Sequence, residues 1–434
     1  MPSLNAIDEL IASTRWLDTH EHLLEEATRL RPPSPEQQYH PCDDWSYLFI
    51  HYAADDLASS GLTTPERNRL FSTALSPVEK WAVFEPYWRR TRNTGYMRAV
   101  AESVRRLFGL ELSAATVDAI SEAMQELKRP GFYRTVLTDA AGVESCQVNS
   151  LESTFCVTEY PDLLPQDLNI GLLCLPEREK LDEWQTVSGI SVQRVEDMLG
   201  VIDSYFSQFA KDAVAVKLPW AYQRSLAVGK PDLAAARQAW ELWIAGSELN
   251  EREIAPLQDF LFRHALRLAA DAGLPVKIHT GYFVGNDRMP LGRVRDNLSD
   301  LVPLIVEHPE LDFVLMHMAY PYQHEMIAVA KHFRNAYADL CWAWIIDPVS
   351  TKEFVRRFLA TAPASKLLCF GGDYMVVENV VGHAALAREG LAGALKVAIA
   401  DGTLTLQQAA ELVPELMHGN ARRVFRTAPG PQQA

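Results

Sequence analysis

The apolar residues divide the chain into three regions. Near the N-terminus, Arg15–Leu23 reads as one apolar strand that ends in polar residues. From about Glu25 to about residue 130 the apolar residues follow helical spacing, as at Thr94–Val100. From Ala141 onward, short β-branched or apolar runs alternate with amphipathic segments of helical length. This alternation is typical of repeated βα units that form a parallel sheet.

The number of strand candidates predicts the fold class. Seven runs after Ala141 and the N-terminal strand make eight, and eight parallel strands with intervening helices close into an α/β protein of the (β/α)8 TIM barrel type. We therefore predict a single barrel over residues 1–434. Residues 25–130 would form a helical insertion after the first strand and cover one mouth of the barrel. The seven runs are Gly142–Val148, Leu168–Leu175, Ala213–Pro219, Pro275–His279, Leu311–His317, Ala336–Cys341 and Lys366–Phe370.

The composition narrows the class of protein. Hydrophobic residues make up 48% of the 434 residues and charged residues 22%, which is typical of a globular chain. The formal net charge of −15 argues against a nucleic-acid partner. Six cysteines lie far apart without a C-x-x-C pair, and neither a signal peptide nor a membrane-spanning run is visible. We expect a cytoplasmic protein that has no disulfides and does not bind membranes.

The N-terminal strand carries the first candidate chemistry. His20 and His22 are separated by one residue. Alternate side chains of a strand point to the same face, so both imidazoles can reach one metal ion. A histidine pair on a surface strand is the alternative for so short a motif.

Three further polar residues fall at the ends of predicted strands. His279 ends the fifth strand, His317 ends the sixth and Asp373 follows the eighth. Each alone has another explanation, because a histidine can be part of a core and Asp373 can cap a helix after its Gly-Gly turn. Together with the histidine pair they would meet at the C-terminal end of the barrel, which predicts a metal site. Imidazole and carboxylate ligands suit zinc, iron or manganese.

The order of these ligands along the chain resembles the amidohydrolase superfamily of metal-dependent barrels. It is similar above all to the amidohydrolase-related branch that includes the N-terminal part of a fungal developmental protein fused to a glutamine-synthetase-like domain. Uronate isomerases, which have a large helical insertion after the first strand, resemble the chain more distantly. The resemblance spans essentially the whole chain and does not specify a reaction. The segments that carry it are Asp18–Leu23, Val216–Tyr222, His279–Tyr282, His317–Tyr322 and Gly371–Asp373.

The resemblance implies a role for each candidate ligand. His20 and His22 would bind the more buried metal, with Asp373 as a further ligand and as the general base. His279 and His317 would bind a second metal or, with one metal, complete the site and polarise the substrate. One or two divalent ions are expected, with zinc favoured and iron or manganese as alternatives.

Lys217, at the end of the fourth strand, is a further candidate. It falls where many binuclear members of the superfamily carry a carboxylated lysine that bridges two metals. A salt-bridged or substrate-binding lysine is the alternative. The resemblance therefore makes Lys217, His317 and Asp373 the catalytic candidates.

Loops beyond the strands supply candidates for binding a small-molecule substrate. Tyr222, Arg224, Tyr282 and Tyr320 would ring the mouth of the barrel and could hold a substrate carboxylate or carbonyl. Aromatic residues at such a rim can equally serve packing alone.

The metal site predicts an enzyme. A divalent ion lowers the pKa of bound water from 15.7 to roughly 7, and a nearby carboxylate can pass the released proton to a leaving group. We expect a metal-dependent hydrolase of a C–N, amide-like bond in a small polar substrate, where the bond type follows from the resemblance alone. A dinuclear iron or manganese oxygenase that hydroxylates a small amino acid or carboxylic acid is the alternative. A non-catalytic, metal-bearing partner subunit is the third hypothesis.

The insertion also suggests self-association. Trp45, Trp81 and Trp88 are candidate interface anchors, although they can equally pack inside the insertion. We expect a homo-oligomer, or a hetero-oligomer with a related subunit.

Overall fold

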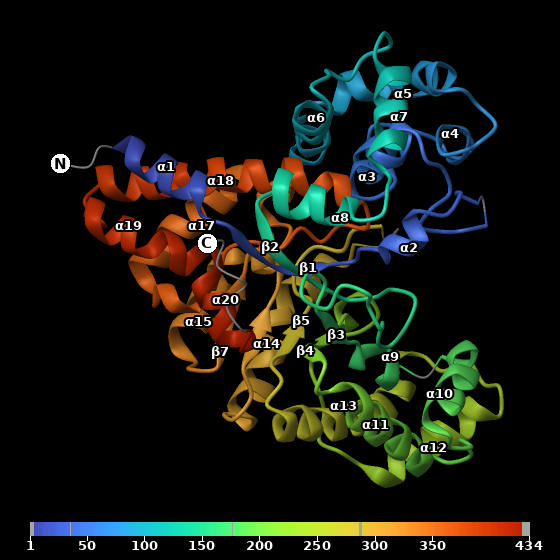
Figure 1. Ribbon diagram of the computed structural model, residues 1–434. Coiled ribbons are helices and arrows are strands. Elements are labelled where there is room, and N and C mark those ends of the chain that lie inside the picture. Colours follow the sequence, from blue (N-terminus) through green and yellow to red (C-terminus); the bar gives the residue numbers. More distant parts are fainter. Residues whose placement is uncertain (1–3, 35, 176, 286–288, 428–434) are drawn as a thin grey trace.

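The computed structural model describes residues 4–34, 36–175, 177–285 and 289–427 and contains an eight-stranded parallel sheet (Figure 1). Each strand pairs with its neighbours in chain order. The strands are β1 (Trp16–Glu21), β2 (Val143–Val148), β3 (Gln166–Leu168), β4 (Ala213–Leu218), β5 (Val276–Ile278), β6 (Phe313–Leu315), β7 (Ala336–Asp339) and β8 (Leu367–Leu368).

Backbone hydrogen bonds close the sheet into a barrel. The Thr19 N–H donates to the Phe370 carbonyl (3.0 Å), and the Asp373 N–H donates to the His20 carbonyl (2.8 Å). The first strand therefore lies beside the segment that continues the last strand. The predicted (β/α)8 barrel is confirmed.

The prediction for the third strand was wrong. Leu168–Leu175 was expected to be a strand, but β3 ends at Leu168 and helix α9 (Ile170–Cys174) follows. The Asn169 side chain caps this helix by accepting a hydrogen bond from the Leu172 N–H (3.2 Å). A short, uninterrupted apolar run has no periodicity that separates a buried strand from a buried helix.

The barrel interior changes from apolar to polar along its axis. At the end where the strands begin, Leu17, Ala215, Val314 and Leu368 form one apolar cluster with residues of the C-terminal helix. Nearer the other end is a buried ion pair, in which the Lys277 ammonium contacts both oxygens of Asp167 at 2.9 Å, and Lys277 also donates to the Thr19 carbonyl (2.7 Å). Such a buried charge is tolerated because it is paired and hydrogen-bonded. Polar side chains therefore underlie the end where the strands finish.

The described elements between β1 and β2 are all helices. They have a separate aromatic core, in which the Phe84 ring lies 5.0 Å from Trp45, 5.4 Å from Trp81 and 5.8 Å from Trp88. Trp45 and Trp81 are buried, so these tryptophans pack inside the insertion, which was the alternative to an interface role. The elements are α2 (Glu26–Arg29), η1 (Trp45–Phe49), α3 (Tyr52–Ser59), α4 (Thr64–Leu70), α5 (Pro77–Thr91), α6 (Gly95–Phe108), α7 (Val117–Leu127), α8 (Phe132–Arg134) and the π-helical η2 (Thr135–Ala140).

The remaining helices surround the barrel. Within the described ranges no helix is both long enough and apolar enough to cross a membrane. The helices are α1 (Leu4–Ser13), α10 (Leu181–Ser188), α11 (Val195–Phe209), α12 (Leu233–Ile244), α13 (Glu251–Ala272), α14 (Leu291–Glu307), α15 (Gln323–His332), α16 (Ala343–Ile346), α17 (Pro348–Thr361), α18 (Val377–Ala400), α19 (Leu406–Pro414) and α20 (Asn420–Phe425).

Helix α18 joins the insertion to the barrel (Figure 1). Gly382 of α18 lies against the Ala99 carbonyl of α6, where a Cβ would overlap that oxygen. On α2, the buried Arg29 pairs with the buried Glu378 of α18 (2.9 Å). These contacts position the start of the insertion next to the segment that follows β8.

Candidate metal centre

Three side chains bring their ligand atoms together at the C-terminal end of the barrel. The Nε2 atoms of His20 and His22 are 3.3 Å apart. Oδ1 of Asp373 lies 3.3 Å from the first of these nitrogens and 3.2 Å from the second. The three atoms form a nearly equilateral triangle whose members come from both sides of the barrel closure.

This triangle fits a divalent metal ion. Nitrogen and oxygen ligands bind zinc at about 2.0 to 2.1 Å, which places neighbouring ligands of a tetrahedral site about 3.3 to 3.4 Å apart. The three distances between the ligand atoms are of this size. Two imidazoles and a carboxylate also suit iron or manganese, so the donor set fits a metal without selecting one.

Hydrogen bonds orient the two imidazoles toward the triangle. Nδ1 of His22 donates to the Asn149 carbonyl (2.7 Å), and this bond directs the opposite ring nitrogen, Nε2, at the triangle. Nδ1 of His20 lies 3.7 Å from Oδ2 of Asp167, the carboxylate held by Lys277. Asp167 and Lys277 were not recognised in the sequence, because their relation to His20 depends on the barrel geometry.

A strained turn places Asp373. This residue has a φ of 61°, a left-handed conformation that non-glycine residues rarely adopt. Gly371 and Gly372 precede it, and a Cβ on Gly372 would overlap the Glu21 carboxylate. Left-handed backbone also occurs after β6 and β7, at His317 and Trp342. Several residues at the rim of the barrel, next to the candidate metal centre, therefore have a left-handed backbone conformation.

Two buried carboxyl groups on β1 accept hydrogen bonds from the backbone of the turn that contains Asp373. Oδ1 of Asp18 accepts hydrogen bonds from the N–H groups of His20 (3.0 Å) and Gly372 (3.3 Å). Oε2 of Glu21 accepts from the Tyr374 N–H (2.5 Å). Burial raises the pKa of Asp18 to about 7 and the pKa of Glu21 well above its usual range. The Glu21 carboxylate therefore contacts the turn at Gly372 and Tyr374.

The contact between Gly372 and Glu21 gives a testable prediction. Gly372→Ala is expected to reduce the free energy of unfolding by about 1 to 3 kcal/mol, because a methyl group would be forced into a filled site. Gly292→Ala is the matched control, since no atom of the described residues lies within 4 Å of a Cβ at that position. Thermal unfolding of both variants measures the difference. Equal stability of the two variants would contradict the tight contact.

The remaining predicted ligands surround the triangle but are not all directed at it. Nδ1 of His317 lies 3.1 Å from the Cys341 carbonyl and 3.9 Å from Oδ2 of Asp373. Ligand atoms of His317, Cys341 and Asp373 lie within 4.8 Å of one another, so a second ion could share Asp373. Nε2 of His279 instead lies 2.9 Å from the Tyr282 carbonyl. The structure thus brings His317 beside the triangle, while His279 is directed at a loop.

Lys217 is buried beside the triangle. Its ammonium nitrogen lies 3.3 Å from Nε2 of His20 and 2.9 Å from the Met316 sulfur. No carboxylate bonds to it directly among the described residues, so the salt-bridged alternative lacks a partner. Burial lowers the pKa of Lys217.

Burial and neighbouring charges set the protonation of the site. Burial lowers the pKa of His20 to about 4 and that of His317 to about 3, so both imidazoles are neutral at pH 7, as metal ligands must be. Burial alone would raise the pKa of Asp373, but contacts with His20 and His22 hold it well below its usual range. The centre therefore presents neutral imidazoles at His20 and His317 and an ionised carboxylate at Asp373.

The predicted substrate-binding residues have different environments. The Tyr222 ring lies 4.5 Å from His279, and the Tyr282 ring lies 5.8 Å from Trp342 and 6.2 Å from Tyr320. These tyrosines line the loops next to the centre, and their role in binding substrate stays a prediction.

Arg224 differs from its prediction as a rim residue. It is buried, and its guanidinium pairs with Asp259 (2.8 Å) and donates to Gln258 (3.0 Å). It also donates to the carbonyls of Ser225 and Ala227 (both 3.1 Å). Its donors therefore support the loop after β4, and we do not assign it to substrate.

The insertion supplies two residues that sequence reasoning missed. His51 and Tyr52, at the start of α3, lie over the centre. The Tyr52 ring stacks on Trp342 at 4.7 Å, and His51 stacks on Tyr52 at 3.9 Å. Burial and the neighbouring Asp373 carboxylate raise the pKa of the Tyr52 phenol well above its usual range. The only signal in the sequence was a His-Tyr pair at a helix start, which does not reveal where the insertion folds.

The Tyr52 hydroxyl is expected to assist the reaction. Tyr52→Phe keeps the stacked ring and removes the polar group next to Asp373, so it should lower kcat/KM about tenfold with little change in stability. Tyr96→Phe is the control, since Tyr96 belongs to the same stack and its buried hydroxyl has no hydrogen-bond partner in the described part of the chain. Steady-state kinetics compares the two. Equal effects would assign Tyr52 to packing alone.

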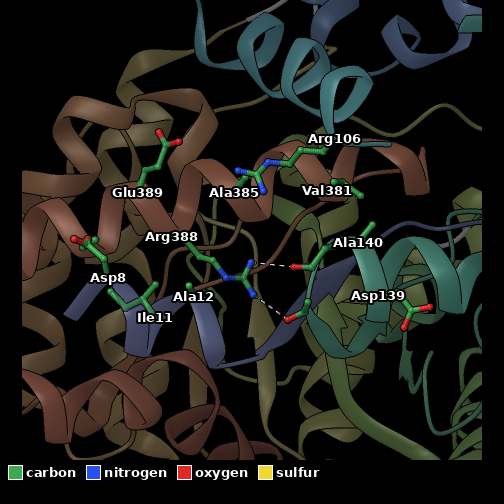
Figure 2. A pocket seen from close by; sticks show the side chains of 13 residues that line it. Asp8, Ile11, Ala12, Arg106, Asp139, Ala140, Val381, Ala385, Arg388 and Glu389 are labelled. Carbon is green, nitrogen blue, oxygen red and sulfur yellow. Dashed lines mark hydrogen bonds between the residues drawn. The ribbon is translucent and has the colours of Figure 1, made fainter. Parts of the chain in front are cut away.

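A separate cavity of about 400 Å³ lies where β2 begins, between α1, η2 and α18 (Figure 2). Arg106, Asp139 and Glu389 are among the charged residues of its wall. Arg388 donates to the carbonyls of Ala141 (2.9 Å) and Gly142 (3.0 Å), so its guanidinium braces the loop before β2. Active sites of such barrels lie at the opposite end, and we assign no chemistry to this cavity.

Comparisons with known proteins agree with this geometry. A family model described as amidohydrolase matches residues 190–427, which is more than half of the chain. The protein fluG of Emericella nidulans is 27% identical over 188 residues, covering 42% of this chain. That match spans 21% of the length of fluG.

Solved structures share the fold over nearly the whole chain. Uronate isomerase from Thermotoga maritima has a TM-score of 0.77 at 16% identity and covers 97% of each chain. Glucuronate isomerase from Caulobacter crescentus has a TM-score of 0.75 at 17% identity, with 99% of this chain and 95% of that one covered. A putative metal-dependent hydrolase from Lactobacillus casei has a TM-score of 0.67 at 14% identity and 97% coverage of both. With the barrel, the His and Asp groups able to hold a divalent metal and the family match, this chain belongs to the amidohydrolase family of metal-dependent enzymes.

Proposed function

We propose that the protein is a metal-dependent hydrolase that cleaves a C–N, amide-like bond in a small polar substrate. The observation that carries the proposal is the triangle of His20, His22 and Asp373, in which only one carboxylate oxygen takes part. The other oxygen of Asp373 lies 3.9 Å from Nδ1 of His317 and is not part of the triangle. A ligand set of this kind suits the activation of water beside a base.

Each side chain of the centre has a distinct role in the proposed reaction. A divalent ion held by His20, His22 and Asp373 would supply hydroxide at neutral pH and polarise the substrate carbonyl. Asp373 accepts the proton released from water and returns it to the leaving nitrogen. His317, beside the free oxygen of Asp373, orients the carbonyl, and Tyr52 donates to the oxygen on which negative charge develops. The aromatic stack over the centre excludes bulk water.

Lys217 is proposed to act as a carbamate. A neutral lysine amine adds to carbon dioxide and loses a proton, which gives an anionic oxygen ligand. The lowered pKa of Lys217 and its 3.3 Å distance from His20 favour this chemistry. A carbon-13 NMR signal from protein kept in labelled bicarbonate, absent in Lys217→Met, tests it.

Metal analysis followed by an activity panel tests the proposed function. Protein purified without added metal should contain one or two zinc ions per chain and hydrolyse N-acyl compounds with release of an amine. Iron or manganese together with oxygen uptake would replace the hydrolase by the oxygenase. Protein that binds metal but turns over no substrate under either assay would favour the non-catalytic subunit.

A further inference from the structure

A narrow cavity borders the candidate metal centre at His22. It has a volume of about 80 Å³ and is formed by the segment after β1 and the loop after β2. His22, a triangle ligand, is part of its wall together with Glu25, Gln166 and Met375. A ligand in this cavity would therefore contact a residue of the candidate metal centre.

An outer groove continues the cavity to the surface. The groove has a volume of about 420 Å³ and is bounded by residues 36–40 of the insertion and by Lys180. The two spaces have five wall residues in common, so they adjoin, and we refer to the two together as the passage. The shared residues are Leu24, Thr28, Tyr39, Leu151 and Glu152.

The inner part of the passage combines apolar walls with unpaired hydrogen-bond acceptors. Leu23, Val148 and Met375 are among its apolar residues. Gln166 is 2% exposed, and its side-chain N–H group donates to the Leu164 carbonyl (2.8 Å). Its Oε1 has no hydrogen-bond partner among the residues that the structure describes. That bond fixes which end of the amide is the oxygen, so the free group is an acceptor. A buried acceptor without a partner is costly, and a donor on a ligand would relieve the cost.

Glu25 adds a carboxylate to the same wall. It is half-buried, and its oxygens accept only from neutral groups: the Thr158 hydroxyl (3.2 Å), the Glu159 N–H (3.3 Å) and, weakly, the Cys156 thiol (3.8 Å). Among the described residues no lysine or arginine lies within 4.0 Å of it. Burial raises its pKa, as expected for a carboxylate that lacks a counter-ion.

The outer groove is negatively charged, as is the inner cavity at Glu25. Glu36 and Glu152 lie in its wall, and no described cation pairs with either carboxylate. The Lys180 ammonium is neutralised by Glu183 (2.9 Å) and bonds to the Glu152 carbonyl (2.7 Å). His40 contacts the Arg29 guanidinium at 2.7 Å, and burial together with Arg29 lowers its pKa to about 4, so it carries no charge at pH 7. A cation is favoured along the whole passage and an anion is not.

We propose that this passage is the substrate-binding cleft and that it selects a substrate with a positively charged amine on a short aliphatic stem. Glu25 is the counter-ion of the ammonium group, the Gln166 carbonyl accepts one of its protons, and the leucine and methionine side chains contact the stem. The inference rests on the proposed function for the bond that is cleaved, which would be an amide placed at the ion next to His22. Binding of the amine itself does not depend on turnover.

Calorimetry with three isosteric probes tests the inference on metal-loaded protein. n-Butylamine at pH 7 should bind, whereas n-butanol and butyrate, which are the neutral and anionic counterparts, should bind at least about tenfold more weakly. Glu25→Gln should weaken amine binding about tenfold or more. Glu159→Gln removes the same charge from an exposed position on the neighbouring loop and should leave binding within about twofold.

The outcomes separate this inference from the proposed function. Amine binding that depends on Glu25 supports the cleft even if no amide is hydrolysed, and in that case the proposed function fails alone. Tighter binding of butyrate, no binding of the amine, or equal weakening by Glu25→Gln and Glu159→Gln would overturn the inference. Amine binding that vanishes with the metal but survives Glu25→Gln would also overturn it, because the amine would then be a ligand of the ion.

Discussion

His20→Ala is expected to abolish high-affinity metal binding and, with it, activity. His20 supplies one corner of the ligand triangle and is completely buried, so no solvent-exposed group can take its place. Loss of a partner that merely orients a ligand costs 10- to 100-fold in affinity, and loss of the ligand itself should cost more than about 100-fold. Equilibrium dialysis against zinc and elemental analysis of the purified variant measure the change.

Two further variants make the His20 experiment specific. His20→Gln keeps a polar side chain of similar length and separates loss of the ligand from a cavity in the barrel. His264→Ala removes a surface histidine that pairs with Asp203 far from the centre, and it should keep full metal content. Full metal content and full activity in His20→Ala would refute the metal centre described above.

Asp373→Asn is expected to lower kcat by about 100- to 10,000-fold while the fold is retained. An asparagine amide cannot accept the proton that the carboxylate takes from water. Asparagine adopts left-handed backbone more readily than most residues, so the φ of 61° at this position should be preserved. The effect can therefore be assigned to the loss of charge and basicity.

The Asp373 experiment needs metal content measured alongside kinetics. Weaker metal binding is expected because one ligand becomes neutral, so activity is compared at saturating metal. Asp212→Asn makes the same chemical change at an exposed position and serves as a control for altered charge. Unchanged turnover in Asp373→Asn at saturating metal would exclude the carboxylate as the base.

The fold could be predicted from the sequence wherever an apolar run ended in a polar residue. β1, β4 and β5 end that way, and their places were predicted to within a few residues. β3 was displaced because Ile170–Cys174 is apolar throughout and the cap at Asn169 decides that it is a helix. The local pattern of apolar residues therefore predicts where a strand lies. Helix caps and tertiary contacts decide at which residue the strand ends.

Only those residues of the candidate site that lie at the ends of strands could be predicted from the sequence. His20 is the second-last residue of β1, His22 comes directly after that strand and Asp373 follows β8, and the parallel sheet brings the ends of its strands together. Tyr52 lies in the insertion, and its approach to Asp373 depends on how helices of another region pack. Arg224 looked available because its partner Asp259 is distant in sequence, on the facing helix α13. Such residues are placed by contacts that no local spacing encodes.

The hydrogen bond from Asp373 to the His20 carbonyl lies on the seam where the first strand meets the end of the last. The triangle spans this seam, so it forms only once the barrel has closed. An ion bound there would link the two strands. At a free metal concentration of a hundred times its Kd, binding would stabilise the closed barrel by about 2.7 kcal/mol. Metal supply would then govern how often the seam opens and how long the chain survives proteases.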